Sequence, residues 1–286
     1  MAIGAIGVSG LAKVLDEQSE TGQKLPVLFT SHGNPMDIPL PAYGNPFLSY
    51  LGDLGQKIRK NYEVKTILVI SAHWCTNGSF VNASPWPNTI YDYYGFPDNY
   101  YTQKYPAPGN PELANELANS ISEINSTTDW GFDHGNWPML IHLFPEANIP
   151  VFQLSIDYHR PPQYHHDLAT QLKEYRKKGV LIIGSGALIH NLKLAMSKMQ
   201  SGDLSLYGWE QEFDEWIKNR IDDRDVKAIL DYQKNKNGLL AAPTPDHFVP
   251  LIYSMALIED GDEIEHTFDD MLPGFSNRSF VVGLNQ

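Results

Sequence analysis

Cysteine is almost absent from this protein, because Cys75 is the only one in a chain of 286 residues. A single thiol cannot form an intramolecular disulfide, and it cannot supply the thiolate cage of a structural zinc site. We therefore expect a protein of the reducing cytoplasm, in which any metal is held by ligands other than sulfur.

Basic residues and long apolar runs are also scarce. Lys and Arg number 21 against 34 Asp and Glu, which gives a formal net charge of -13. A chain this acidic lacks the positive surface that binds nucleic-acid phosphates or anionic lipids. No run of about 18 apolar residues occurs, and residues 1–15 contain no basic leader followed by an apolar stretch. We expect a soluble, unprocessed chain that binds neither nucleic acid nor membrane.

Hydrophobic residues make up 42% of the chain and are gathered in short runs rich in branched side chains. Runs of strand length occupy residues 25–30, 66–71, 150–156 and 180–183, and stretches with helical patterns, at 111–124, 138–144, 162–178 and 188–199, alternate with them. This alternation indicates an α/β fold with a mostly parallel central sheet, flanked by helices on both faces. We expect one domain over residues 25–286, preceded by a peripheral segment, residues 1–24, with a weak helical pattern at 4–20.

Two further segments have a distinct character. Residues 202–237 are charged and follow a helical pattern, which predicts a hairpin of helices at the surface. Residues 75–109 contain many Pro, Gly and Asn and six tyrosines, and they show no sustained period. A connection this long is usually functional or disordered, and the tyrosines favour a packed loop beside a pocket for an aromatic ligand. The alternative is that the rings only fasten the loop to the body of the protein.

Three of the expected strands are followed by a histidine. His32 comes after the first, His73 after the second, and His190 after the strand at 180–183, each preceded by small residues. Ligands of open α/β sheets bind at the carboxyl ends of the strands. We therefore expect these three side chains to converge on one site.

Two more histidines are candidates for the same site. His247 stands at the expected start of a helix that runs to Ile258, and His134 stands in a glycine-flanked turn. The remaining five histidines carry no such pattern and are expected on the surface or in packing roles: His142, His159, His165, His166 and His266. No Walker-type phosphate loop, dinucleotide fingerprint or G-x-S-x-G elbow occurs in the sequence.

A group of neutral imidazoles suits zinc, iron, copper or nickel, whereas magnesium and calcium require mostly oxygen ligands. Two chemistries fit such a site when coordination positions of the metal remain open. One is hydrolysis by a zinc-bound water, and the other is activation of dioxygen and a substrate at ferrous iron. The residue types alone leave both open.

The sequence resembles the LigB-like class III extradiol ring-cleavage dioxygenases, in the branch that includes 4,5-DOPA extradiol dioxygenase. The motifs that carry the resemblance occur in the family's order from about residue 25 to the C-terminus. They are SHGNPM at 31–36, SAHW at 71–74, TIYDYYGFP at 89–97, YPAPG at 105–109, WGFDHG at 130–135, QLSID at 153–157, GSG at 184–186 with HNL at 190–192, and TPDH at 244–247.

The resemblance implies a LigB-like catalytic domain with one divalent metal ion, Fe(II) for dioxygenase activity or Zn(II) as in similar proteins. It implies that His32, His73 and His247 bind the metal, and that His190 is a fourth ligand or the acid/base; His134 is the alternative acid/base. The better-studied enzymes use a carboxylate as third ligand, for which Asp246 is the candidate here; we favour His247.

The same resemblance implies that a catechol such as DOPA and dioxygen are the substrates, and that the ring opens to a muconic semialdehyde. In the tyrosine-rich loop we expect Tyr91, Asp92 and Tyr94 to contact the catechol. The alternatives are a zinc hydrolase that uses the same histidines and a non-catalytic binding relative.

Overall fold

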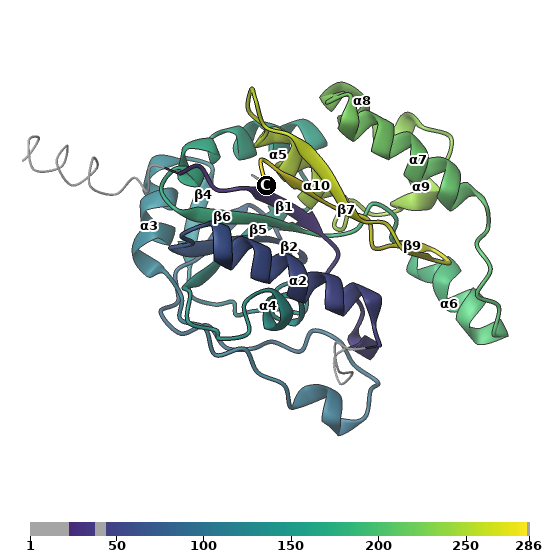
Figure 1. The fold of residues 1–286 in the computed structure, drawn as a ribbon, viewed down its shortest axis with the longest axis horizontal. Coiled ribbons are helices and arrows are strands. Elements are labelled where there is room, and N and C mark those ends of the chain that lie inside the picture. Colours follow the sequence, from purple (N-terminus) through teal and green to yellow (C-terminus); the bar gives the residue numbers. More distant parts are fainter. Residues whose placement is uncertain (1–22, 38–43, 285–286) are drawn as a thin grey trace, which may run out of the picture.

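The computed structural model describes residues 23–37 and 44–284 (Figure 1). The expected helix at residues 4–20, and most of the peripheral segment 1–24, lie outside the described residues.

An eight-stranded sheet forms the centre of the protein, with the strand order β4-β3-β5-β2-β6-β1-β10-β7. Its four central strands, β5, β2, β6 and β1, run parallel, while β10 and β7 add antiparallel strands at one edge. The strands span β1 Val27–Thr30, β2 Thr66–Thr76, β3 Ser79–Asn82, β4 Ile124–Thr127, β5 Val151–Asp157, β6 Val180–Ser185, β7 Ile264–Phe268 and β10 Ser279–Val282, and a separate hairpin pairs β8 Met271–Leu272 with β9 Phe275–Ser276. The predicted α/β fold with a mostly parallel sheet is confirmed.

Helices cover both faces of the sheet (Figure 1). Successive side chains of a strand point to opposite faces, so Val27 and Phe29 enter one core cluster and Leu28 enters the other. The first cluster lies under α3, α5 and α10 with the α7–α9 region, and the second lies under α2 and α4. The helices span α2 Pro46–Asn61, α3 Pro111–Ser120, α4 Trp137–Leu143, α5 Pro162–Thr170, α6 Leu192–Ser201, α7 Trp209–Asp222, α8 Val226–Leu230, α9 Gly238–Ala241 and α10 Val249–Ala256.

The predicted helix at 188–199 was wrong at its N-terminal end, which matters for the site. Asn191 caps α6, because its side chain accepts a hydrogen bond from the Leu194 amide, so the helix begins at Leu192. His190 therefore lies before the helix, where its backbone bridges to Phe275. The predicted helix to residue 178 likewise ends at Thr170 and is followed by a 3-10 turn, Lys173–Arg176.

The predicted helical hairpin at 202–237 is present as α7 and α8, but it is not only a surface feature. Phe213, Ile217 and Ile221 of α7 are fully buried in the first core cluster. Helix α2 was not predicted from the sequence. Its Gly55 packs so closely on α4 that an added Cβ would lie 2.1 Å from the Leu143 carbonyl oxygen.

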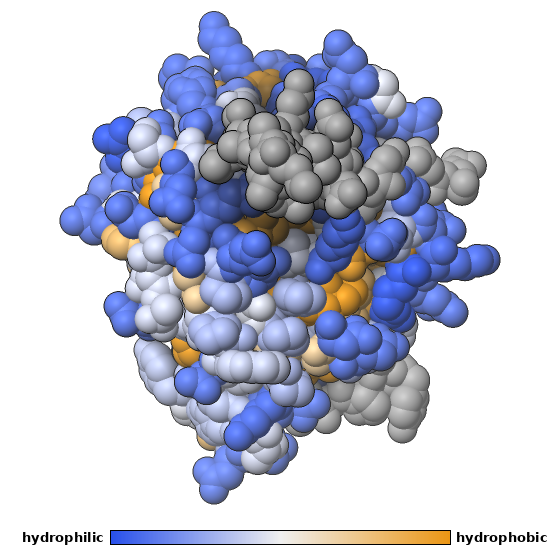
Figure 2. Space-filling view, turned by 90° about the vertical axis from the view of Figure 1, so that its left-hand side faces the viewer, coloured by the Kyte–Doolittle hydropathy of each residue, from blue (hydrophilic) through white to orange (hydrophobic). Residues whose placement is uncertain are grey.

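The outside of the protein fits its acidic composition. Hydrophilic side chains cover most of the face in Figure 2, and apolar atoms are confined to small separate patches. Within the described residues, no helix is both long enough and apolar enough to cross a membrane.

Candidate metal centre

His32 and His73 meet at the carboxyl ends of the central strands. His32 follows β1 by two residues, and His73 lies in the stretch of β2 where the pairing with β5 is interrupted, between Ile70 and Cys75. An irregular stretch of this kind redirects side chains away from the regular pleat. The strand predicted to end at Ser71 thus continues to Thr76, with His73 in its irregular part.

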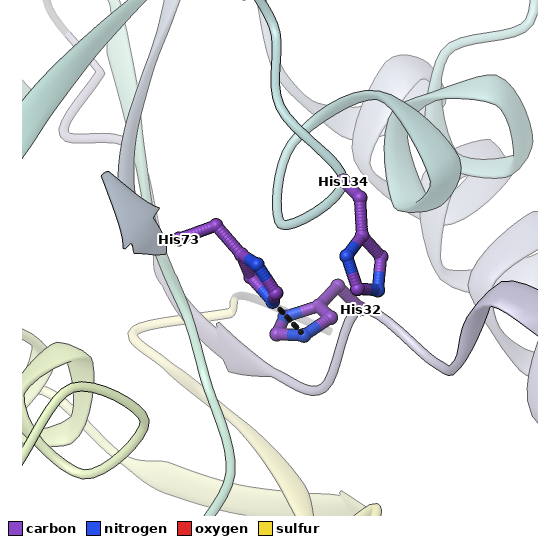
Figure 3. A group of neighbouring side chains, drawn as sticks. All are labelled: His32, His73 and His134. Atoms are coloured by element: carbon purple, nitrogen blue, oxygen red, sulfur yellow. Dashed lines mark hydrogen bonds between the residues drawn. The ribbon is translucent and has the colours of Figure 1, made fainter. Parts of the chain in front are cut away.

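The two imidazoles face each other through their Nε2 atoms, which lie 3.2 Å apart (Figure 3). Two imidazole nitrogens that bind one ion at about 2.1 Å lie roughly 3.0–3.4 Å from each other. The spacing therefore suits a shared metal, provided that both Nε2 atoms present lone pairs.

Asp92 determines which nitrogen of His73 carries the proton. Its Oδ2 lies 2.7 Å from His73 Nδ1, and a carboxylate can only accept, so Nδ1 is protonated and donates. Burial lowers the pKa of His73, but the hydrogen bond and charge of Asp92 outweigh it and leave the pKa raised. In the neutral ring, the Nε2 that faces His32 is the lone-pair nitrogen.

Ser185 likewise determines which nitrogen of His32 carries the proton. The Ser185 hydroxyl donates to the Gly135 carbonyl, so its oxygen is left to accept from His32 Nδ1, 3.0 Å away. Burial, together with the neighbouring histidines, holds the pKa of His32 well below its usual value, so the ring is neutral. Its Nε2 is then also a lone-pair nitrogen, and when His73 is neutral the two lone pairs can bind one cation.

His247 presents a third such nitrogen. Its Nδ1 donates to the neighbouring Asp246 carboxylate, and its Nε2 is buried without a hydrogen-bond partner among the described residues. The His247 ring centroid lies 5.4 Å from that of His32 and 5.2 Å from that of His73. Asp246 thus stands behind His247 and orients it, as carboxylates commonly do for metal-binding histidines.

His190 lies against His247 rather than against the other two rings. The His190 and His247 rings stack with centroids 3.5 Å apart and an interplanar angle of 2°. Burial lowers the pKa of His190 to about 2, so its imidazole is neutral. The ligand atoms of His190, Asp246 and His247 lie within 4.8 Å of one another, as those of His32, His73 and His134 do.

His134 reaches the centre from the loop before α4 (Figure 3). Its ring centroid is 4.1 Å from that of His73, and its backbone N–H donates to Asp92 Oδ1 at 2.7 Å. Burial holds its pKa well below the usual value, and neither ring nitrogen has a partner in the described part of the chain. The sequence indicated His134 as a candidate for this site and as an acid/base, and the structure places its nitrogens within reach of an ion shared with His32 and His73.

Asp133 stabilises this arrangement through hydrogen bonds, and its role was not predicted from the sequence. Its fully buried carboxylate accepts hydrogen bonds from Ser71 Oγ (2.6 Å), the Gly135 amide (3.0 Å), Trp130 Nε1 (2.9 Å) and Gln153 Nε2 (2.8 Å). Ser71 Oγ in turn accepts the His73 amide hydrogen. The residue therefore ties the His134 loop to the irregular part of β2; it lies in the WGFDHG motif, but the sequence assigned it no role.

The three residues expected to contact the substrate are placed differently from one another. The Asp92 carboxylate accepts hydrogen bonds from His73 Nδ1 and from the His134 amide, as described above. Tyr91 donates to the Gln103 carbonyl and packs its ring on Trp137. Tyr94 is 91% exposed, so its position at the surface does not support the expected contact. Tyr93 takes the inner position, with its ring 5.5 Å from that of His134.

Comparison with known proteins agrees with a histidine metal centre on an α/β sheet. A family model described as the catalytic LigB subunit of aromatic ring-opening dioxygenase matches residues 26–280. The chain belongs to this family and is an extradiol aromatic ring-opening dioxygenase, an oxidoreductase. Dioxygenases of the family depend on a metal, which the buried histidines could hold.

Similar proteins come from bacteria and plants. The chain is 36% identical over 246 residues to 4,5-DOPA dioxygenase extradiol of Escherichia coli, covering 84% of this chain and 87% of the relative. It is also 36% identical to the protein of the same name from Beta vulgaris, covering 83% and 88%. A crystal structure of an uncharacterized protein from Escherichia coli K12 superposes with a TM-score of 0.76 at 30% identity, covering 91% of this chain and all of that one.

Proposed function

We propose that this protein opens the ring of a catechol such as DOPA with dioxygen, using one divalent metal ion held by His32, His73 and His247. The observation that carries the proposal is that each of these rings has its Nδ1 proton engaged by a neighbouring acceptor, so that each ring in its neutral form presents an Nε2 lone pair. Neutral imidazole nitrogens are the ligands that Fe(II) and Zn(II) accept. The names of the relatives suggest DOPA as the catechol.

Iron, when bound, supplies the redox chemistry, because Fe(II) can activate dioxygen while Zn(II) acts only as a Lewis acid. The contribution of this chain is to orient the catechol and to manage its protons. Tyr93 and Trp137 provide aromatic surface close to the histidines.

His190 and His134 are proposed to move the protons. A catechol that binds a metal through both oxygens must lose protons, and a neutral imidazole next to it can accept one. Both rings are buried and neutral, and the negative charge of the bound substrate favours their protonated form. The proton then returns to an oxygen of the opened product, a muconic semialdehyde that contains both atoms of dioxygen.

The test is to strip the protein of metal and reload it anaerobically with Fe(II) or with Zn(II). We expect turnover of DOPA by the iron-loaded protein alone. Turnover that is equal with zinc would contradict the dioxygenase chemistry, and hydrolysis of ester substrates by the zinc-loaded protein would favour a zinc hydrolase instead.

A further inference from the structure

A pocket opens beside the metal centre, with His32 in its wall. It lies between the turn that follows β1, the start of α2, and α4, and its empty space, counted with the solvent at its mouth, is about 420 Å³. Since His32 belongs both to the centre and to this pocket, a substituent on a catechol bound at the centre can extend into it.

The walls of the pocket combine apolar surface with one acidic group. Leu48, Trp137 and Ile141 provide apolar and aromatic surface suited to a short carbon chain. Asp37, in the 3-10 turn Pro35–Asp37, is the acidic group. Among the described residues that line the pocket there is no Lys or Arg, and burial lowers the pKa of His142, which leaves that ring neutral near pH 7.

The carboxylate of Asp37 has only neutral partners in the described part of the chain. Its Oδ2 accepts from the Asn34 side chain at 2.8 Å and from the Asn34 amide at 3.3 Å, and its Oδ1 accepts from Asn45 Nδ2 at 3.0 Å. A carboxylate has about four acceptor positions, so one position remains for a ligand. A half-buried carboxylate without a cationic partner is stabilised most by a cation that brings N–H donors.

We infer that this pocket binds the side chain of the catechol and that Asp37 pairs with an ammonium group on it. This inference rests on the proposed function and specifies its substrate class: catechols with a short aliphatic ammonium chain. A catechol whose chain ends only in a carboxylate meets the charge of Asp37 and has no cation in the pocket wall to compensate. The net charge of -13 further favours the approach of a cationic substrate.

The test compares three catechols that differ only at the end of the chain: 4-(2-aminoethyl)catechol, 4-ethylcatechol and 3-(3,4-dihydroxyphenyl)propionate. For the iron-loaded protein we expect kcat/KM to fall in that order. In Asp37→Asn, kcat/KM for the ammonium substrate should fall about tenfold to a hundredfold, the range of a hydrogen bond to a charged group. The value for 4-ethylcatechol should change less than about twofold in the same variant.

Asp53→Asn is the matched control, because Asp53 is an exposed residue of the nearby helix α2 and the substitution removes the same charge. We expect it to leave the order of the three substrates unchanged. The inference would be overturned if Asp37→Asn lowered kcat/KM equally for the ammonium and the ethyl substrates. It would also be overturned if the unmodified protein preferred the propionate.

Binding to the zinc-loaded protein separates this inference from the proposed function. Calorimetric titration with the same three catechols measures the preference without turnover. Tighter binding of the ammonium catechol, lost in Asp37→Asn, would support the inference even if the iron-loaded protein opened no ring. Ring opening of all three catechols at equal rates, with equal affinities, would refute the inference and leave the dioxygenase proposal standing.

Discussion

The rings of His190 and His247 lie parallel, with their centroids 3.5 Å apart. A metal ion lies close to the plane of an imidazole that binds it, along the nitrogen lone pair. Two stacked rings cannot both point a nitrogen lone pair at one ion, so only one of them would bind it. The hydrogen bond from His247 Nδ1 to Asp246 leaves His247 Nε2 as the lone-pair nitrogen, which favours His247 as the ligand and His190 as the proton acceptor.

The first prediction follows from this geometry. His190→Ala should retain its metal and lose turnover by about 10²–10⁴-fold, the usual contribution of a general acid or base. His32→Ala and His247→Ala should lose the metal itself. Metal analysis of each purified variant, combined with the rate of ring opening after addition of Fe(II), distinguishes the two classes. If purified His190→Ala contained as little metal as His32→Ala, His190 would be a metal ligand, and His134 would be the acid/base.

A second prediction concerns Asp92, which holds the Nδ1 proton of His73 at 2.7 Å. Asp92→Asn removes the charge and leaves an amide that can donate as well as accept, so the tautomer of His73 is no longer fixed. Loss of such a supporting partner typically weakens metal binding by about 10–100-fold. Competition with a chelator measures the affinity, and Asp98→Asn, an exposed position of the same loop, is the control. Unchanged affinity in Asp92→Asn would be incompatible with this role.

A third prediction contrasts two adjacent tyrosines. Tyr93 is 8% exposed and packs on Tyr101 and His134, whereas Tyr94 is 91% exposed. Tyr93→Ala should lower kcat/KM for the catechol by at least about tenfold, because it removes aromatic surface next to the histidines. Tyr94→Ala should stay within about twofold, as expected for a surface substitution. A larger loss in Tyr94→Ala than in Tyr93→Ala would restore Tyr94 as the residue that contacts substrate.

A fourth prediction concerns stability far from the metal. The guanidinium of Arg176 is fully buried and donates to Asp262 Oδ2 at 2.7 Å, near the end of the sheet opposite the histidines. Burial opposes ionisation of Asp262, but the hydrogen bonds from Arg176 and Lys24 lower its pKa to about 2. A carboxyl with a lowered pKa stabilises the fold above its unfolded pKa of about 4, and this contribution is lost as the pH falls toward 2.

Urea unfolding of the native protein and Asp262→Asn from pH 6 to pH 3 measures this contribution. Asp262→Asn should reduce the free energy of unfolding by about 3 kcal/mol at pH 6, because the buried Arg176 loses its nearer counterion and keeps Glu259, at 3.6 Å. The difference should shrink below about pH 4. Asp231→Asn removes an exposed partner of Lys234 and should change little. A difference that does not depend on pH would rule out the ion pair as the cause.

The sequence predicted the parts of the fold that local patterns encode. Continuous apolar runs, such as the one in β6, and a Pro at the first position of a helix, as in α3, produce recognisable elements. Strands β7 and β10 are different, because they pair antiparallel at the sheet edge and are short, five and four residues long. Strand β10 pairs with β1, which lies more than 200 residues earlier in the chain, and no local pattern can indicate such a partner.

The candidate site was predictable to the extent that it depends on topology. His32 follows β1 and His73 lies near the carboxyl end of β2, and these two parallel strands flank β6, so their convergence could be expected. The hydrogen bonds that set their tautomers could not, since Asp92 and Ser185 reach the histidines from other segments of the chain. The choice between Tyr93 and Tyr94 depends on which ring turns inward in an irregular loop, and a sequence without a period does not specify this.

Oxygen consumption by the iron-loaded protein tests the central claim most directly. Protein reloaded anaerobically with Fe(II) is mixed with DOPA in air-saturated buffer, and dioxygen uptake is recorded together with the yield of ring-opened semialdehyde. The account predicts that dioxygen and catechol are consumed in equal amounts, and that His32→Ala abolishes both processes. A protein that binds Fe(II) through His32, His73 and His247 and yet consumes no dioxygen with any catechol would contradict it.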